Sequence, residues 1–177
     1  RRLRSLAEWS RSPSLASSRV DVAYDRTHGR SIHERCMNEA DKLARQVADT
    51  LLQREGTGTA WGISIDDARE GYALIRMKLR DDMLNGHRIG HGGMIFALAD
   101  TAFAYACNSR NENTVAQNAS ISFLAPAQPG DVLIAEAREV SRSGRSGVYQ
   151  VSVKTAAGAV IAEFTGLSRT IGGAIIN

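Results

Sequence analysis

One carboxylate stands in the middle of an otherwise uncharged stretch, His91 to Asn108, which reads HGGMIFALADTAFAYACN. Asp100 has alanine, leucine and phenylalanine neighbours, so folding would draw it out of water, and an unpaired buried charge is costly. Two interpretations are open. The carboxylate either accepts hydrogen bonds from a loop, or it is held in a partly dry cleft as a general base or a nucleophile.

The beginning of the same stretch could bind an anion. Gly90-His91-Gly92-Gly93 precedes the apolar run, where the first backbone N–H groups of a helix have no acceptor within the helix. Glycine lets a ligand approach the backbone, and the helix dipole favours negative charge there, so the segment suits an oxyanion. The alternative is that the glycines only form a tight turn before the helix.

The spacing of the two features limits how they act together. Gly92 and Asp100 are eight residues apart, which is about 12 Å along a helix axis. One reacting carbonyl cannot touch both on the same helix. If both serve one reaction, Asp100 must come from a second subunit whose helix runs antiparallel, and a two-fold dimer then has two equivalent sites.

Other chemistries fit the sequence less well. His87 and His91 have a four-residue spacing but lack the glutamate of a zinc-protease motif, and Asn85-Gly86 indicates a loop. Gly144-Arg145-Ser146-Gly147 does not match a serine-hydrolase elbow. Cys107 lies near the end of the helix, where the dipole disfavours a thiolate, and is expected in the core. We expect neither a metal nor a cofactor.

The surrounding elements predict an α+β domain with a curved antiparallel sheet. Asn38 to Arg54 has apolar residues on one helical face, and it ends at Glu55 to Thr59. Strands are expected at Trp61–Ile65, Tyr72–Leu79, Val115–Leu124, Asp131–Val140, Gly147–Thr155 and Ala159–Thr170, with Asp66 to Gly71 and Asp81 to Gly90 as connections. Because the central helix is apolar on every side, it should be buried all round, with the sheet wrapped about it. A dimer is expected to cover what the wrapped sheet leaves open.

Length and composition fit one domain and exclude several classes of protein. The chain has 177 residues, 43% of them hydrophobic, and no apolar run reaches the roughly 18 residues of a membrane span. Cys36 and Cys107 do not form a disulfide framework, so a reducing, cytoplasmic setting is expected. Residues 37–177 contain 14 Lys or Arg and 15 Asp or Glu, a net charge of −1, so this part is not a nucleic-acid binder.

Residues 1–36 are set apart by eight Arg and four acidic residues, a net charge of +4. Their Ser and Arg content predicts a disordered leader, with the domain over 37–177. A mitochondrial transit peptide is one interpretation, against which the four acids count. We favour a cloned or mis-started upstream segment, with Met37 as the natural start. A DNA-binding arm is a third option.

The central motif resembles a known family, the hot-dog-fold thioesterases of bacterial phenylacetate degradation. The similarity spans about residues 40–174 and rests on these segments: Leu84-Asn85-Gly86-His87, His91-Gly92-Gly93, Phe96 to Asn108, Phe123-Leu124-Ala125-Pro126, Gly130-Asp131, Gly147-Val148-Tyr149 and Ile171-Gly172-Gly173. The resemblance implies a hot-dog fold and hydrolysis of acyl-CoA thioesters, with phenylacetyl-CoA and its ring-hydroxylated forms favoured. It also implies homodimers that assemble into a homotetramer.

The resemblance also assigns roles to residues. Asp100 matches the catalytic carboxylate of the family, and Gly92 matches the residue whose backbone N–H polarises the thioester carbonyl. Asn85 and His91 match polar residues that line the site. The remaining expected substrate contacts are Gly93 and Thr101, beside these residues, and three cations for the phosphates of coenzyme A, Arg142, Arg145 and Arg169.

Two alternative functions remain open. A hot-dog hydratase or dehydratase acting on acyl thioesters would pair a histidine, here His91, with an acid in one cleft. A non-catalytic acyl-CoA sensor would use residues 1–36 to bind DNA, although that segment has no helix-turn-helix pattern. Phe96, Leu98 and Phe103 are candidates for the lining of an acyl pocket.

Overall fold

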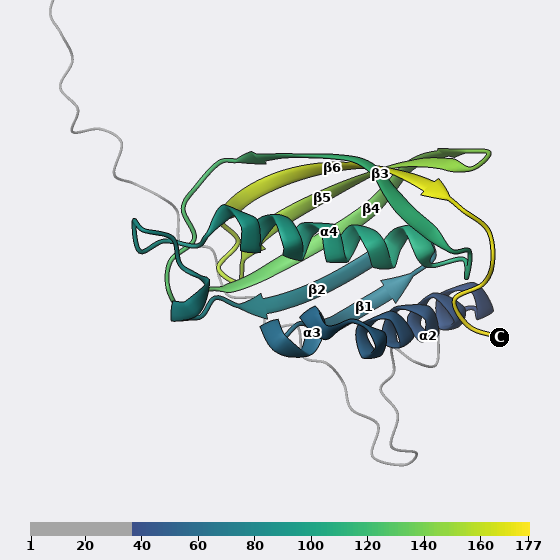
Figure 1. Cartoon of the computed structure of the whole chain (residues 1–177), viewed down its shortest axis with the longest axis horizontal. Helices are drawn as coiled ribbons and strands as arrows, with labels where there is room; N and C mark the ends of the chain where they lie inside the picture. Colours follow the sequence, from purple (N-terminus) through teal and green to yellow (C-terminus); the bar gives the residue numbers. More distant parts are fainter. Residues whose placement is uncertain (1–36) are drawn as a thin grey trace, which may run out of the picture. The chain divides into compact units, whose positions relative to one another are not determined.

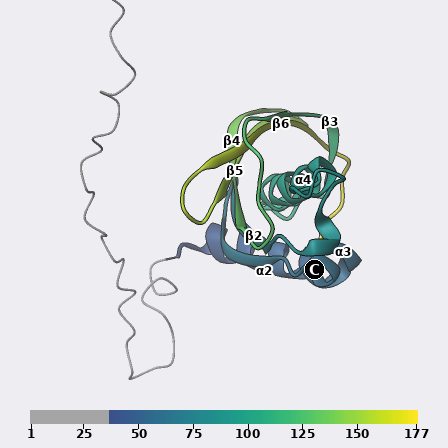
Figure 2. The same ribbon diagram turned by 90° about the vertical axis from the view of Figure 1, so that its left-hand side faces the viewer.

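The helix α4 (Gly92–Asn108) runs across the concave side of a six-stranded sheet, in a computed structural model that describes residues 37–177 (Figure 1). Viewed along the helix, the sheet curls around α4 (Figure 2). This arrangement confirms the α+β architecture predicted from the sequence. The expectations for residues 1–36 lie outside the described residues.

Every pair of neighbouring strands in the sheet is antiparallel, in the order β1-β2-β4-β5-β6-β3. The strands are β1 (Ser64–Arg69), β2 (Tyr72–Lys78), β3 (Thr114–Phe123), β4 (Val132–Ser143), β5 (Ser146–Thr155) and β6 (Val160–Thr170). The connection that contains α4 carries the chain from β2, near one edge, to β3 at the opposite edge. Because β1 and β3 are the edge strands, each has one side without a neighbour in the described chain.

The core lies between α4 and the inward faces of the strands. Alternate residues of β5 are buried, as a strand with one covered face requires. The ring of Phe103 on α4 packs against Tyr149 and Phe164, with centroids 5.3 Å and 5.8 Å away. Gly166 of β6 lies under the same ring, where a Cβ would be 2.9 Å from two of its carbons.

The first helix, α2 (Glu39–Arg54), begins where the sequence predicts. The Asn38 side chain caps it by accepting a hydrogen bond from the Asp41 N–H at 2.8 Å. Its apolar face packs through Ala44, Val47 and Ala48, which are fully buried. A polar outer face and an apolar inner face together account for its position beside the sheet.

The segment after α2 differs from the sequence-based prediction. Instead of a break followed by a strand from Trp61, a second short helix, α3 (Gly56–Trp61), forms and ends at Gly62, whose φ is +68°. The first strand therefore begins at Ser64 and includes most of the segment Asp66 to Gly71, which the sequence predicts to be a connection. An edge strand tolerates charge, and Asp66 and Asp67 of β1 form ion pairs with Arg76 and Arg69.

No helix within residues 37–177 is long and apolar enough to cross a membrane.

The close approach of Gly166 to Phe103 gives a stability prediction. Gly166→Ala should push the ring out of its position between Tyr149 and Phe164, and overpacking of this kind costs about 1–3 kcal/mol. Gly56→Ala is the matched control, because a Cβ at that position meets nothing within 4 Å. Chemical denaturation should show a lower free energy of unfolding for Gly166→Ala only. Equal stability of the two variants would contradict this packing.

Candidate active site

Asp100 lies in the middle of α4 and is half-buried. Its carboxylate makes no hydrogen bond or ion pair within residues 37–177, so the interpretation that it is held by a loop of its own chain is not supported. Burial raises the pKa of Asp100 above that of an ordinary carboxyl group. A carboxylate that is partly removed from water and unpaired is available to act on a substrate.

The expectation that α4 is buried all round is wrong for the single chain. Gly93, Ala97, Asp100 and Ala104 remain at least partly exposed, at helical spacings of four, three and four residues. These residues form one stripe, here called the α4 stripe, along the side of the helix that the sheet does not reach. The residues beside Asp100 in the stripe have small side chains, so another chain or a substrate could approach the carboxylate closely.

His91 caps the N-terminus of α4, because its Nδ1 accepts a hydrogen bond from the Gly93 N–H at 2.9 Å. The Gly93 N–H is thereby occupied. The Gly92 N–H makes no hydrogen bond within the described chain, and the open end of the helix adds its partial positive charge. Of the two glycines, Gly92 therefore offers the free donor.

Asn85 supports the loop that faces this helix end. Its Oδ1 accepts from the backbone N–H groups of His87, at 2.9 Å, and Ile89, at 3.4 Å. Its Nδ2 amide has no acceptor in the described residues and remains free to donate. Asn85 and Gly92 line the same cavity, of about 520 Å³, together with Phe123.

Asp100 lines a different cavity. This one has a volume of about 280 Å³ and is bounded by α2, α4, the start of β3 and Ile175. Within one chain the Asp100 carboxylate and the donors of Gly92 and Asn85 therefore line separate cavities. This follows from the eight-residue separation of Gly92 and Asp100 on α4.

Comparison with known proteins identifies the family. The thioesterase superfamily model matches residues 87–162. The chain is 41% identical over 132 residues to a protein named acyl-coenzyme A thioesterase PaaI from Escherichia coli strain K12, covering 75% of this chain and 94% of the relative. This chain belongs to the thioesterase superfamily.

Solved structures agree with the sequence match. The PaaI protein from the phenylacetic acid degradation operon of Escherichia coli superposes with a TM-score of 0.75 and 39% identity, covering 76% of this chain and 98% of that one. The TT0310 protein from Thermus thermophilus gives a TM-score of 0.64 and 35% identity, covering 67% and 99%. The hot-dog fold expected from the sequence is thus confirmed, and the chain is a thioester hydrolase.

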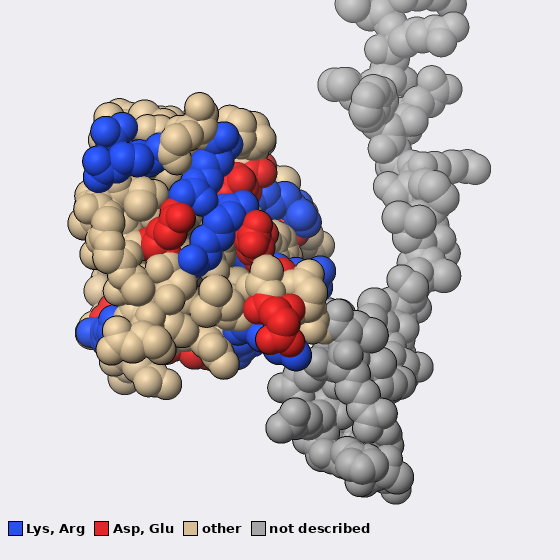
Figure 3. All heavy atoms as spheres, turned by 90° about the vertical axis from the view of Figure 1, so that its right-hand side faces the viewer, with Lys and Arg blue, Asp and Glu red and all other residues tan. Residues whose placement is uncertain are grey.

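The three arginines expected to bind coenzyme A lie at one end of the thioesterase, around the β4–β5 hairpin. Arg142 is ion-paired with Glu112. Arg145 donates to the Thr170 carbonyl at 2.8 Å, and Arg169 donates to the Ser146 hydroxyl at 3.3 Å. Figure 3 shows this end, where Lys and Arg side chains interleave with Asp and Glu. Arg145 and Arg169 are exposed and carry no carboxylate partner in the described chain, so they are freer than Arg142 to bind a phosphate.

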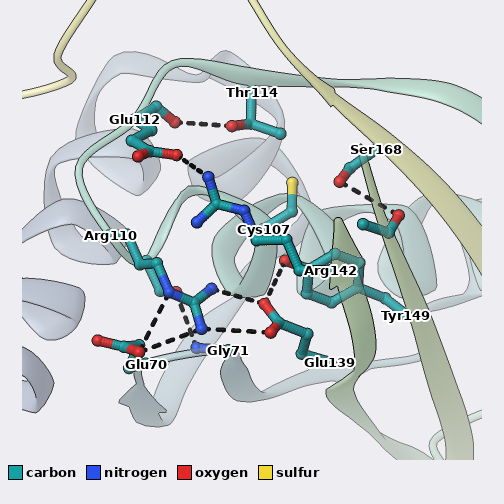
Figure 4. Close-up of polar contacts among 12 residues, drawn as sticks. Glu70, Gly71, Cys107, Arg110, Glu112, Thr114, Glu139, Arg142, Tyr149 and Ser168 are labelled. Carbon is teal, nitrogen blue, oxygen red and sulfur yellow. Dashed lines mark hydrogen bonds and ion pairs between the residues drawn. The ribbon is translucent and has the colours of Figure 1, made fainter. Parts of the chain in front are cut away.

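A polar network fixes the C-terminal end of α4, and sequence reasoning missed it (Figure 4). Arg110, two residues beyond the helix, donates to both oxygens of Glu139 on β4, at 2.6 Å and 3.2 Å. The Tyr149 hydroxyl donates to the same carboxylate at 2.8 Å. Burial works against ionisation of Glu139, but the hydrogen bonds and the charge of Arg110 outweigh it and lower the pKa of Glu139. The network ties the helix to the sheet and so fixes the position of Asp100.

Other expected site residues contribute to packing. Thr101 is 9% exposed, lies outside the α4 stripe and does not line the cavity described above for Asp100. Phe103 lines the Asp100 cavity, whereas Phe96 packs on Phe164 with ring centroids 5.5 Å apart and Leu98 is fully buried.

Burial raises the pKa of the Cys107 thiol to about 12, so the thiol stays protonated at neutral pH. The described residues contain no cluster of side chains able to hold a metal ion.

The raised pKa of Asp100 predicts a pH-dependent cost to stability. Because the folded pKa lies above the unfolded one, the penalty is complete above the folded value and disappears below the unfolded value, about pH 4. Asp100→Asn should therefore raise the Tm of the thioesterase at neutral pH, and the gain should shrink on acidification. Scanning calorimetry at fixed protein concentration would measure this, since association also shifts the Tm. An Asp100→Asn Tm equal to or below that of wild type at neutral pH would refute it.

Proposed function

We propose that this thioesterase hydrolyses acyl-CoA thioesters at a site completed by a second copy of the chain. The observation that carries the proposal is the separation on α4 of an unpaired carboxylate, Asp100, from the free N–H of Gly92. Both groups suit thioester hydrolysis, and the similarity to a protein named acyl-coenzyme A thioesterase supports coenzyme A as the carrier.

In the proposed reaction the thioester carbonyl oxygen accepts a hydrogen bond from the Gly92 N–H of one subunit. The Asn85 amide is close enough to the same cavity to add a second donor. Asp100 of the other subunit either removes a proton from an attacking water or attacks the carbonyl carbon itself. In the first route the C–S bond breaks as the hydroxyl of water bonds to the carbonyl carbon, and the proton taken by Asp100 passes to the departing sulfur, giving the free acid and coenzyme A thiol. In the second route the C–S bond breaks to leave a mixed anhydride on Asp100, and a water then hydrolyses the anhydride, regenerating the carboxylate and releasing the free acid, while its proton goes to the coenzyme A thiolate.

The edge strand β3 supports a dimer. Of its ten residues only Thr114 is buried, and Phe123 is 52% exposed. Pairing of β3 with its two-fold copy would cover that edge and would bring two α4 helices together in antiparallel orientation. The α4 stripe would then face its counterpart, with each Asp100 near the other helix start. We further propose that such dimers associate into a homotetramer.

Aryl-acetyl groups are the proposed acyl class, with phenylacetyl-CoA and hydroxyphenylacetyl-CoA as the first substrates to test. The similarity to a protein from a phenylacetic acid degradation operon supports this choice. A hydratase reaction is less suited to the site. Since His91 Nδ1 accepts from Gly93, a neutral His91 carries its proton on Nε2 and can donate a hydrogen bond but has no free base there.

The first test of the proposed function is loss of the carboxylate. Asp100→Asn should lower kcat for phenylacetyl-CoA by about 10²–10⁴-fold, the usual contribution of a positioned base, and should leave the mass of the assembly unchanged. Thiol release and light scattering would measure the two effects. Asp81→Asn, at an exposed aspartate, is the matched control and should retain full turnover. Undiminished hydrolysis by Asp100→Asn would remove the assignment.

The two-subunit site can be tested by complementation. Gly92→Pro removes one N–H donor, and the backbone of proline is compatible with the first turn of a helix. The added Cβ would lie 3.1 Å from the ring of Phe123, an exposed side chain that must shift slightly, and this variant should be inactive like Asp100→Asn. Unfolding the two inactive variants together and refolding them should form mixed dimers with one intact site, restoring about a quarter of wild-type activity under random assortment. No recovery, with mixed dimers verified by mass, would show that both groups act within one chain.

A further inference from the structure

The cavity beside Asp100 has mostly apolar free surface. The side chains that face it include Leu51 of α2, Phe103 of α4, Val115 of β3 and Ile175 of the C-terminal segment. These come from four distant parts of the sequence. The carboxylate proposed to act on the thioester also lines this cavity, so a group attached to the reacting carbonyl could lie in it.

Apart from Asp100 itself, several polar groups in the cavity wall are already paired with one another. The Asn108 side chain accepts from the Thr114 N–H and donates to the Thr114 carbonyl, both at 2.9 Å. The Tyr105 hydroxyl donates to Glu55 at 2.6 Å. A ligand in this cavity therefore meets chiefly hydrocarbon, which suits the acyl part of a thioester better than the polar arm of coenzyme A.

The volume of the cavity limits what it can hold. An apolar cavity of about 150 Å³ in a protein interior accommodates benzene. The Asp100 cavity, at about 280 Å³, has room for one ring and its linker. A second fused ring would take up most of the remaining volume and bring the acyl group against the cavity walls.

One of those walls is the C-terminal segment, residues 171–177. It runs from the end of β6 to the side of α2 (Figure 1). It has no helix or strand, yet two side chains hold it in place. The Asn111 Oδ1 accepts from the backbone N–H groups of Ile175 and Ile176, both at 2.9 Å, and its Nδ2 donates to the Ile176 carbonyl at 2.9 Å. Arg54 donates to the Ile175 carbonyl, also at 2.9 Å.

Asn111 is well suited to this role. Its φ is +59°, a left-handed conformation that few non-glycine residues other than asparagine and aspartate adopt readily. Its carboxamide forms hydrogen bonds with one carbonyl and two N–H groups of the segment, as the backbone of a neighbouring strand would. The backbone of Asn113 adds two further bonds, to Gly173 and Ile171, both at 2.9 Å. The wall is therefore fixed by hydrogen bonds and by its apolar contact through Ile175.

We propose that residues 171–177 form the outer wall of the acyl pocket and set the largest acyl group that the enzyme accepts. Ile175 is the specificity-determining contact, and Asn111 is a positioning residue that holds it there. This inference rests on the proposed thioesterase function of Asp100.

The decisive experiment compares Ile175→Ala with Ile176→Ala, the same change at the adjacent residue, which does not line the cavity. The readout is kcat/KM for naphthylacetyl-CoA divided by kcat/KM for phenylacetyl-CoA. Ile175→Ala should raise this ratio about tenfold, in line with the effect of a few methyl groups on pocket specificity. Ile176→Ala should leave it within about twofold of wild type. Ile175→Trp should do the reverse, lowering phenylacetyl-CoA turnover while acetyl-CoA turnover persists.

Substitutions at Asn111 test the positioning role. Asn111→Gly permits the left-handed backbone and removes the carboxamide, so it should broaden acyl selectivity as Ile175→Ala does. Asn111→Asp keeps the oxygen that accepts from both N–H groups but replaces the donor to the Ile176 carbonyl with a second acceptor, so its ratio should lie between those of wild type and Asn111→Gly. A purely structural role would lower the Tm of both variants without moving the ratio, and that result would overturn the assignment of Asn111.

Failure of this inference is distinguishable from failure of the proposed function. If wild-type enzyme releases no thiol from any of the three thioesters, the proposed function falls, and the acyl pocket falls with it. If wild-type enzyme hydrolyses phenylacetyl-CoA but Ile175→Ala and Ile176→Ala give the same ratio, the function stands and the C-terminal wall is refuted.

Discussion

The structure depends on a carboxylate that its own chain leaves unpaired. Asp100 lies on a helix whose other surfaces are packed into the core, and nothing in the described chain neutralises it. Burying it fully would carry a large desolvation penalty, so the sheet wraps α4 on the remaining sides and leaves the α4 stripe open. The same opening that avoids this penalty gives a substrate access to the carboxylate.

The proposed site is divided between two cavities of the chain. Gly92 and Asn85 gather hydrogen-bond donors at the start of α4, while Asp100 and an apolar cavity occupy its middle. Helix geometry keeps these halves apart within a chain, and antiparallel pairing of two helices would bring them together. The exposed edge strand β3 and the small residues of the stripe are consistent with that pairing.

Polar contacts beyond the C-terminal end of α4 hold the cavity in shape. Arg110 and Glu139 tie the helix to the sheet, Asn108 ties it to the first residue of β3, and Asn111 ties the following loop to the C-terminal segment. The walls of the Asp100 cavity are thus positioned by hydrogen bonds at its rim, while its interior remains apolar.

The sequence by itself determined the central helix and the approximate positions of most strands, and it singled out Gly92 and Asp100 as candidate site residues, because periodicity and short motifs are local. It misplaced the first strand, since Gly62 allows α3 to form after α2. Only the tertiary structure decided which side of α4 stays open, that Glu112 neutralises Arg142, and that Leu51 and Ile175 meet at Asp100. Those outcomes depend on strand register and long-range contacts, which no local pattern of residues encodes.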